Sequence, residues 1–506
     1  MRHKFVMSCL AVCLASIGLS GCSSSTGSSL TPSASSANSQ SAPVFLAGTD
    51  APLPSVVSFQ VTVNSVVISN NGSNGVDLLQ SPQTIDFARF NGLKTLLDFN
   101  SIPAGTYNTV TVSLSNPVIS YLDLTNGTMA QPPAIVTLNN ATLMNSNVTA
   151  QIANGYTVTA GTAAGLKMDF DLRQSLLTDS TGQLTGQVNP IIDFTALTPN
   201  TPTSEIDEFY GTVISVNATQ NSFMIQGAHG RQYTVVLNQA NSGTGVTPTE
   251  WDDQGNEDGN SQGANNGQIN LANLVPNQTI VDIAGQFQPN TQTFDATDVA
   301  IVSQHGYYAG GVVTYVNPTA GQANSFQMYV RGTLPTGTGL QLGQIANVQL
   351  TGNEKFYVFR RHSPLLQFLF TSSLLVPGQH VSIGGMATGA QNAGSVSTDR
   401  VVLHLSGISG TIVPGSMEPS SGSFELVPDG VNGYLLSDGN PAGNPIRVYL
   451  TGKTEYRDGF SSMSDIASTG NTVVRVVGLV LQDPSTGKPV LIGRYVDKTP
   501  ETDSQR

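Results

Sequence analysis

The stretch Gly211-Thr212-Val213-Ile214-Ser215-Val216 decides how the C-terminal part of the chain is interpreted, because it recurs. About 100 residues later it returns as Gly311-Val312-Val313-Thr314-Tyr315-Val316, and more loosely as Gly410-Thr411-Ile412-Val413. A unit of this length is too long for a solenoid rung and has the size of a small domain. Short β-rich runs separated by turn residues favour a barrel in each unit. We predict three related small β-barrel repeats, over residues 207–303, 306–405 and 407–497.

A second recurring feature supports the same three units. Each contains an apolar strand that ends in glycine, at residues 281–285, 381–385 and 473–478. The pattern resembles an uncharacterised domain family associated with bacterial lipoproteins. That resemblance covers about residues 207–497, and it implies no activity.

Strict alternation of apolar and polar residues predicts a different domain upstream of the repeats. It occurs in residues 57–64, 109–114 and 168–173, as in strands with one buried face. No stretch shows a sustained helical period. We therefore expect an all-β chain: an antiparallel β-sandwich over residues 55–199, followed by the three barrels.

The sandwich region also resembles a known family. Ile102-Pro103-Ala104-Gly105-Thr106-Tyr107 and Asp169-Phe170-Asp171-Leu172-Arg173-Gln174-Ser175, with the opening strand, are similar to an uncharacterised domain of bacterial lipoproteins. The resemblance covers about residues 55–197. It implies an architecture related to transthyretin-like and carboxypeptidase-regulatory-like sandwiches. The family has no established activity, so no catalytic residue is implied.

The N-terminus has the layout of a secretory signal peptide over residues 1–22, with basic residues followed by a short apolar run. Leu19-Ser20-Gly21-Cys22 resembles the lipobox of bacterial lipoproteins, which implies that the Cys22 thiol receives a diacylglycerol. The alternative is an ordinary signal peptide with an incidental Cys22. Ser23, in place of the Asp that marks inner-membrane retention, implies secretion across the inner membrane and lipid anchoring in the outer membrane, facing the periplasm or the surface.

Composition sets further bounds. We expect residues 23–54 to be a Ser/Thr-rich flexible linker and residues 498–506 a polar tail. The net charge is −13 and only 10% of residues are charged, which argues against nucleic acid as a partner. Cys9 and Cys13 lie in the signal peptide, so no disulfide framework is expected.

Trp251, the only Trp, stands next to an acidic stretch. Carboxylate and amide oxygens there are the ligands that Ca²⁺ prefers, although their spacing does not match an EF-hand loop. A solvated acidic loop is the alternative. Trp251 is a candidate for stacking on a sugar ring, or else packs against its own barrel. The candidate Ca²⁺ ligands are Asp252, Asp253, Asn256, Glu257 and Asp258.

Arg360 and Arg361 interrupt an apolar stretch that contains Phe368. One interpretation is a short apolar helix, begun by Ser363-Pro364, that closes the second barrel. The other is a partner-docking surface, in which the two arginines bind an acidic neighbour such as another copy of this chain.

The sequence contains no HExxH, CxxC, GxSxG or P-loop pattern. Asp169 and Asp171 lie on one strand face, about 6–7 Å apart, and are either an acid–base pair or solvent-facing residues beside Arg173.

We expect a lipid-anchored envelope protein that acts without catalysis in binding, adhesion or scaffolding. Its expected partners are the membrane, through the lipid, and a glycan or envelope protein, with Ca²⁺ the only candidate cofactor. The alternative is an envelope enzyme acting on polysaccharide.

Overall fold

The computed structural model of the chain describes residues 41–53, 55–70, 75–123, 132–180, 183–227, 230–238, 248–251, 270–319, 322–335, 340–350, 352–359, 370–386, 395–428, 445–457, 460–468, 473–483, 486 and 488–498. Strands make up almost all the regular structure of this part, which confirms the all-β prediction. Its two α-helices are short, and none of the described helices has the length and apolar character needed to cross a membrane.

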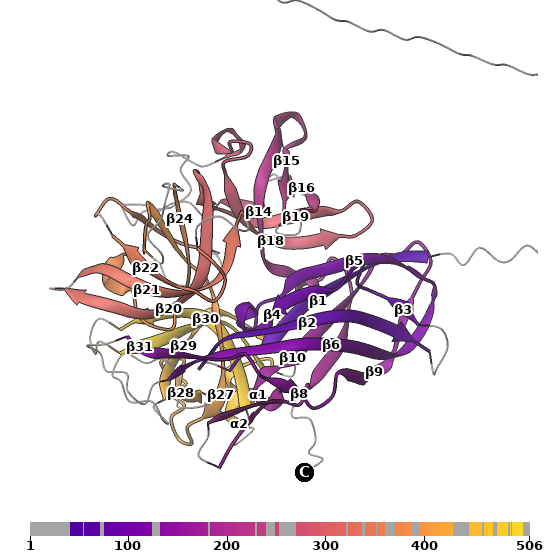
Figure 1. Cartoon of the computed structure of the whole chain (residues 1–506), viewed down its shortest axis with the longest axis horizontal. Coiled ribbons are helices and arrows are strands. Elements are labelled where there is room, and N and C mark those ends of the chain that lie inside the picture. The colour runs from indigo at the N-terminus through magenta and orange to yellow at the C-terminus, as the bar shows by residue number, and fades with distance from the viewer. Residues whose placement is uncertain are drawn as a thin grey trace, which may run out of the picture. The chain divides into compact units, whose positions relative to one another are not determined.

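The N-terminal domain is a sandwich of two main sheets with a small third one. One main sheet has the order β13-β10-β1-β5, and the other has the order β3-β2-β6-β7 with β4 on β2 and β9 on β6. The third has the order β11-β12-β8. Figure 1 shows β2, β6 and β9 running side by side. The elements are β1 (Ser41–Ala51), β2 (Val56–Ser69), β3 (Val76–Asp77), β4 (Gln83–Asp86), the 3₁₀ helix η1 (Phe87–Phe90), β5 (Thr95–Pro103), β6 (Gly105–Asp123), β7 (Ala134–Leu138), β8 (Thr142–Leu143), β9 (Asn147–Val158), β10 (Ala164–Asp171), α1 (Leu172–Ser175), β11 (Leu176–Thr178), β12 (Leu184–Val188) and β13 (Ile192–Leu197).

Strand β1 corrects two expectations. It lies within residues 23–54, which we expected to be a flexible linker, yet it is almost entirely buried. Val44 and Leu46 belong to the sandwich core, whereas Phe45 and Ala47 pack in the core of the first barrel. A strand buried on both faces has no alternating pattern, so its sequence gave no strand signal. Strand β1 also pairs in parallel with β10, so the sandwich is mixed rather than antiparallel throughout.

The C-terminal part consists of three units, named here barrel 1 (residues 206–303), barrel 2 (306–405) and barrel 3 (406–498). Barrel 1 contains β14 (Ile206–Asn217), β15 (Ser222–Gln226), β16 (Gln232–Leu237), β17 (Glu250–Trp251), β18 (Ile280–Gln288) and β19 (Thr293–Ser303), preceded by η2 (Pro202–Ser204) and with η3 (Ala218–Gln220) and η4 (Leu271–Asn273). Barrel 2 contains β20 (Gly306–Thr319), β21 (Gln322–Leu334), β22 (Ile345–Gln349), β23 (Lys355–Val358), η5 (Ser372–Leu374), β24 (His380–Met386), β25 (Ser395–Ser397) and β26 (Arg400–Leu403). Barrel 3 contains β27 (Ser406–Ile412), β28 (Ser423–Pro428), β29 (Ile446–Arg457), α2 (Met463–Ser468), β30 (Val473–Gln482) and β31 (Pro489–Lys498).

The three units share one pattern of strand pairing. In each, the first strand (β14, β20 or β27) pairs antiparallel with the second (β15, β21 or β28) and with β18, β24 or β30. Barrels 1 and 3 close through a parallel pair, β16 with β19 and β29 with β31. In barrel 2 the corresponding strand is split, so that β25 pairs with β22 and β26 with β24. The sequence repeat therefore corresponds to a repeated strand topology.

Residues 87–94, called here the linking segment, leave the sandwich and contact all three barrels. The segment begins with η1 and ends just before β5. Leu93 packs in a core that barrels 2 and 3 share. Three hydrogen bonds complete these contacts: Lys94 N to Asp207 Oδ2 (2.9 Å), Arg331 Nη1 to Asn91 Oδ1 (3.0 Å) and Tyr495 OH to the Gly92 carbonyl (3.4 Å). One short piece of the sandwich thus fixes the position of each barrel.

The recurring glycines that reveal the repeat allow strands to approach closely. A Cβ atom on Gly311 would lie 1.9 Å from the Tyr329 carbonyl oxygen, and one on Gly410 would lie 2.2 Å from that of Val427. On Gly211 it would meet the Ile225 side chain at 2.8 Å. A side chain at these positions forces the paired strands apart.

We predict that Gly311→Ala lowers the free energy of unfolding by about 1–3 kcal/mol, the usual cost of overpacking. The matched control is Gly452→Ala, because a Cβ there meets no atom within 4 Å. Urea unfolding of both variants measures the difference. Equal midpoints for the two variants would contradict the close approach of β20 and β21.

Candidate functional site

The strongest chemical cluster in the described structure lies where barrel 1 meets barrel 2. Glu208 on β14, Asp282 on β18 and His404 directly after β26 have ligand atoms that all lie within 4.8 Å of one another. His404 Nδ1 is 3.1 Å from Glu208 Oε1 and 3.4 Å from Asp282 Oδ2. Asp282 and His404 are 0% exposed and Glu208 is 6% exposed.

Strand alternation explains why Asp282 faces the neighbouring barrel. Val281 and Ile283 point into the core of barrel 1, whereas Ile280 and Ala284 belong to an apolar layer that includes Tyr308 and Val402 of barrel 2. Asp282 has the same orientation as Ile280 and Ala284, because side chains two residues apart share a face. It is therefore a charged residue inside an apolar junction.

Hydrogen bonds fix the orientation of all three residues. Tyr210 OH donates to the Glu208 carboxylate, and Phe209 N–H donates to Asp282 Oδ1 at 3.1 Å. Ser382 Oγ, on β24, lies 2.7 Å from His404 Nε2. The site is therefore held by main-chain and side-chain groups of both barrels.

Aromatic rings enclose the histidine. Phe359 lies 5.6 Å from the His404 ring between centroids, and His380 lies 5.1 Å from it. The main-chain N–H of His404 also donates to the main-chain carbonyl of His380 at 2.9 Å. Packing on both sides leaves the ring little freedom to rotate.

The electrostatics follow from burial and from the short distances. Burial lowers the pKa of His404, but hydrogen bonding and charge from Asp282 and Glu208 outweigh it and raise the pKa to about 9. Burial raises the pKa of Asp282, and the Glu208 charge raises it further. Burial also raises the pKa of Glu208, but His380 and His404 lower it more, so its net shift is downward. Burial lowers the pKa of His380 to about 3, so this ring is neutral near pH 7.

The contacts of His404 follow the order of a nucleophilic triad. A carboxylate lies against one ring nitrogen, and the Ser382 hydroxyl lies against the other. An activated serine requires a base within hydrogen-bond reach and a group that orients the base. Both are present, but Ser382 and His404 are 0% exposed, so a substrate does not reach the hydroxyl. In this arrangement the groups can join two barrels or bind an ion, but they cannot attack an external substrate.

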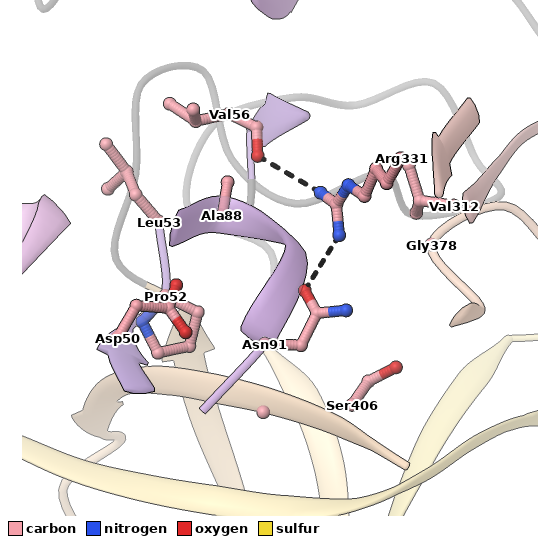
Figure 2. A pocket seen from close by; sticks show the side chains of 11 residues that line it. Asp50, Pro52, Leu53, Val56, Ala88, Asn91, Val312, Arg331, Gly378 and Ser406 are labelled. Carbon is pink, nitrogen blue, oxygen red and sulfur yellow. Dashed lines mark hydrogen bonds between the residues drawn. The ribbon is translucent and has the colours of Figure 1, made fainter. Parts of the chain in front are cut away.

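A second polar site is a cavity of about 20 Å³ lined by the sandwich, barrel 2 and barrel 3 (Figure 2). Arg331 reaches over it, donating to the carbonyls of Val57 (2.6 Å) and Val56 (3.4 Å) and to Asn91. Asp50 Oδ1 accepts from Gly92 N–H at 2.7 Å, whereas Asp50 Oδ2 and Ser406 Oγ have no hydrogen-bond partner in the part of the chain that the structure describes. The cavity has room for about one water molecule.

Burial raises the pKa of Asp50 from 3.8 to about 8, although the Gly92 hydrogen bond opposes this. The charged groups that act on it are Asp169, which raises the pKa, and Arg475 and Arg331, which lower it. Between about pH 4 and pH 8 the folded chain keeps a proton that the unfolded chain has lost. The contribution of Asp50 to stability must therefore fall as the pH rises through this range.

We predict that Asp50→Asn removes this fall, because the amide keeps the acceptor for Gly92 and carries no titrating proton. Urea midpoints of the variant and the native chain should agree near pH 4 and diverge toward pH 8, with the variant more stable. Asp179→Asn, in an exposed turn after β11, is the matched control and should follow the native chain. Parallel pH profiles for Asp50→Asn and the native chain would refute the assignment.

The structure places Trp251 at the end of β17, half-buried, with its ring 6.4 Å from that of Phe223. It packs against its own barrel, as one of our two interpretations had it, and its contact with a ligand stays a prediction. Several other predicted site residues lie outside the described residues. They are Cys22, the candidate Ca²⁺ ligands Asp252, Asp253, Asn256, Glu257 and Asp258, and the candidate partner surface Arg360, Arg361 and Phe368.

Asp169 and Asp171 do not face solvent, as one of our two interpretations had it. Asp171 is buried and caps α1, accepting from Gln174 N–H at 2.9 Å. Asp169 forms ion pairs with Lys167 (3.8 Å) and with Arg475 of barrel 3 (3.7 Å). The sequence pattern identified the strand but not that barrel 3 covers this face.

Sequence reasoning missed Glu208, Asp282, Ser382 and His404. One signal was present, because Asp282, Ser382 and Arg475 occupy the same position in the three repeats. The residue before each pairs with the recurring glycine of its first strand: Val281 with Gly211, Val381 with Gly311 and Val474 with Gly410. A polar residue in this otherwise apolar strand marks the outer face of each barrel as a junction.

Comparison with known proteins adds one match. Residues 41–187 match a family model described as Domain of unknown function (DUF4382). The N-terminal part of the chain, from β1 into β12, is thus similar to an uncharacterised domain, which confirms this part of the expected resemblance. No curated protein matches the chain.

Proposed function

We propose that the chain is a lipid-anchored protein of the cell envelope that acts without catalysis, as a rigid scaffold that binds a glycan or an envelope protein. The anchor rests on Leu19-Ser20-Gly21-Cys22 after a short apolar run. Rigidity is supported by the linking segment and by the buried contacts between the domains. The observation that carries the proposal is that the cluster of catalytic residue types found among the described residues is buried and joins two barrels.

Three barrels with one topology suit a binding role. Repeated modules on one chain gain avidity, because binding of the first raises the effective concentration of the next. A fixed arrangement adds to this gain, since less freedom is lost on binding. The acidic stretch beside Trp251 remains our candidate for Ca²⁺-dependent contact.

The alternative is an envelope enzyme acting on polysaccharide. Its sequence support was the Asp169/Asp171 pair and the acidic stretch. Asp169 forms ion pairs with two cations and Asp171 caps a helix, so this pair favours a structural role. The binding proposal therefore has the stronger support.

We predict that Cys22→Ser abolishes both fatty-acid incorporation and sedimentation with membranes. Metabolic labelling with palmitate and fractionation of the expressing cells measure these effects. Cys13→Ser, which makes the same change inside the expected signal peptide, is the matched control and should behave as the native chain.

If Cys22→Ser still incorporated palmitate and sedimented with membranes, the proposed anchor would be wrong.

A second experiment tests the non-catalytic role. The purified native chain, incubated with envelope polysaccharide, should bind the polysaccharide without generating new reducing ends. Generation of reducing ends would overturn the non-catalytic proposal and favour the enzyme.

A further inference from the structure

We propose that Glu208, Asp282 and His404 bind a zinc ion that joins barrel 1 to barrel 2. This inference concerns the junction between the barrels and is independent of the proposed envelope function. Zinc holds nitrogen and oxygen ligands tetrahedrally at about 2.0–2.2 Å, which separates neighbouring ligand atoms by about 3.3–3.6 Å. The measured separations from His404 Nδ1, 3.1 Å to Glu208 and 3.4 Å to Asp282, are close to that edge length.

Two buried atoms, Asp282 Oδ2 and His404 Nδ1, point into the cluster and make no hydrogen bond of regular geometry to the described residues, although they lie at ion-pair distance, His404 Nδ1 3.1 Å from Glu208 and 3.4 Å from Asp282. A polar atom buried without a partner costs about 1–3 kcal/mol, so such atoms normally have one. An ion between them satisfies both.

The other polar contacts of these residues match what surrounds metal ligands. A ligating histidine usually has its second ring nitrogen held by a hydrogen bond, and ligating carboxylates are hydrogen-bonded in turn. Ser382 holds His404 Nε2, Phe209 N–H holds Asp282 Oδ1 and Tyr210 holds Glu208. Ser382 and Phe209 thus hold the outer atoms of His404 and Asp282, whereas Tyr210 donates to Glu208 Oε1, the same oxygen that faces His404.

The chemistry of the donors favours zinc over the alkaline-earth ions. Two carboxylates and a neutral imidazole around a divalent ion give a site with no net charge, which suits an apolar surrounding. Imidazole favours zinc over Ca²⁺ and Mg²⁺, which take six or more oxygen ligands. Burial of all three ligands favours a structural ion over a catalytic one.

The ligands come from two domains. Glu208 and Asp282 belong to barrel 1 and His404 to barrel 2, in the middle of the apolar layer that includes Ile280, Val302 and Val402. Zinc bound there stabilises the junction itself, because the assembled site is lost when the barrels separate. Without zinc, the protonated His404 takes its place between the carboxylates.

The test uses the full chain purified in detergent. We expect one zinc per chain by elemental analysis after gel filtration. Removal with a chelator should lower the melting temperature by several degrees, and zinc should restore it. Co²⁺ added to the metal-free chain should give the visible absorption of a tetrahedral site.

Asp282→Asn keeps the acceptor for Phe209 N–H and removes the ligand charge, so it should lower zinc affinity at least tenfold. His305→Gln is the matched control. His305 lies 3.1 Å from Asp399 on the surface, where both side chains are 41% or more exposed and no third ligand completes a set among the described residues. It should bind zinc as the native chain does.

Absence of zinc from the native chain, with no effect of chelator or Co²⁺, would show an ordinary ion pair and overturn the proposal. Zinc binding of the same affinity in Asp282→Asn would also overturn it. The measurements on the native chain decide the matter even if the variant fails to fold.

Discussion

Charged side chains buried between domains are the constraint on which this structure depends. A buried ion is costly unless a partner is placed against it, and several of the partners here belong to a neighbouring domain. Arg475 of barrel 3 lies against Asp497 at 2.8 Å and donates to the Asp50 carbonyl of the sandwich at 3.1 Å. Arg331 of barrel 2 donates hydrogen bonds to the main-chain carbonyls of Val56 and Val57 in the sandwich. The outer faces of the barrels are therefore specific for one another and for the linking segment.

The repeat shows how one topology produces different junctions. The same outward position, on β18, β24 or β30, holds Asp282 in barrel 1, Ser382 in barrel 2 and Arg475 in barrel 3. The first two meet at His404, and the third meets the acidic groups of the sandwich. The core positions on either side stay apolar, because they fill the barrel in every copy. The outward position thus lies at a junction between domains in every barrel, whereas the core positions beside it keep the fold.

The sequence predicted much of the fold, for physical reasons. Strands β2, β6 and β10 alternate because one face of each is buried and the other is more exposed, and the barrels were visible because they repeat. Strand β1 was missed because both its faces are buried, and its parallel pairing with β10 depends on a contact more than 100 residues away. The carboxylate–histidine cluster could not be predicted, since residues 208, 282 and 404 meet only when two barrels pack. A charged residue in an apolar strand was the one available indication.

Unfolding in a calorimeter tests most directly whether the four domains form one interlocked unit. If the linking segment and the buried ion pairs fix them together, the full chain should show a single endotherm, with a calorimetric enthalpy equal to the van't Hoff enthalpy. Separate transitions for the sandwich and the barrels, or a calorimetric enthalpy several times the van't Hoff value, would contradict the account.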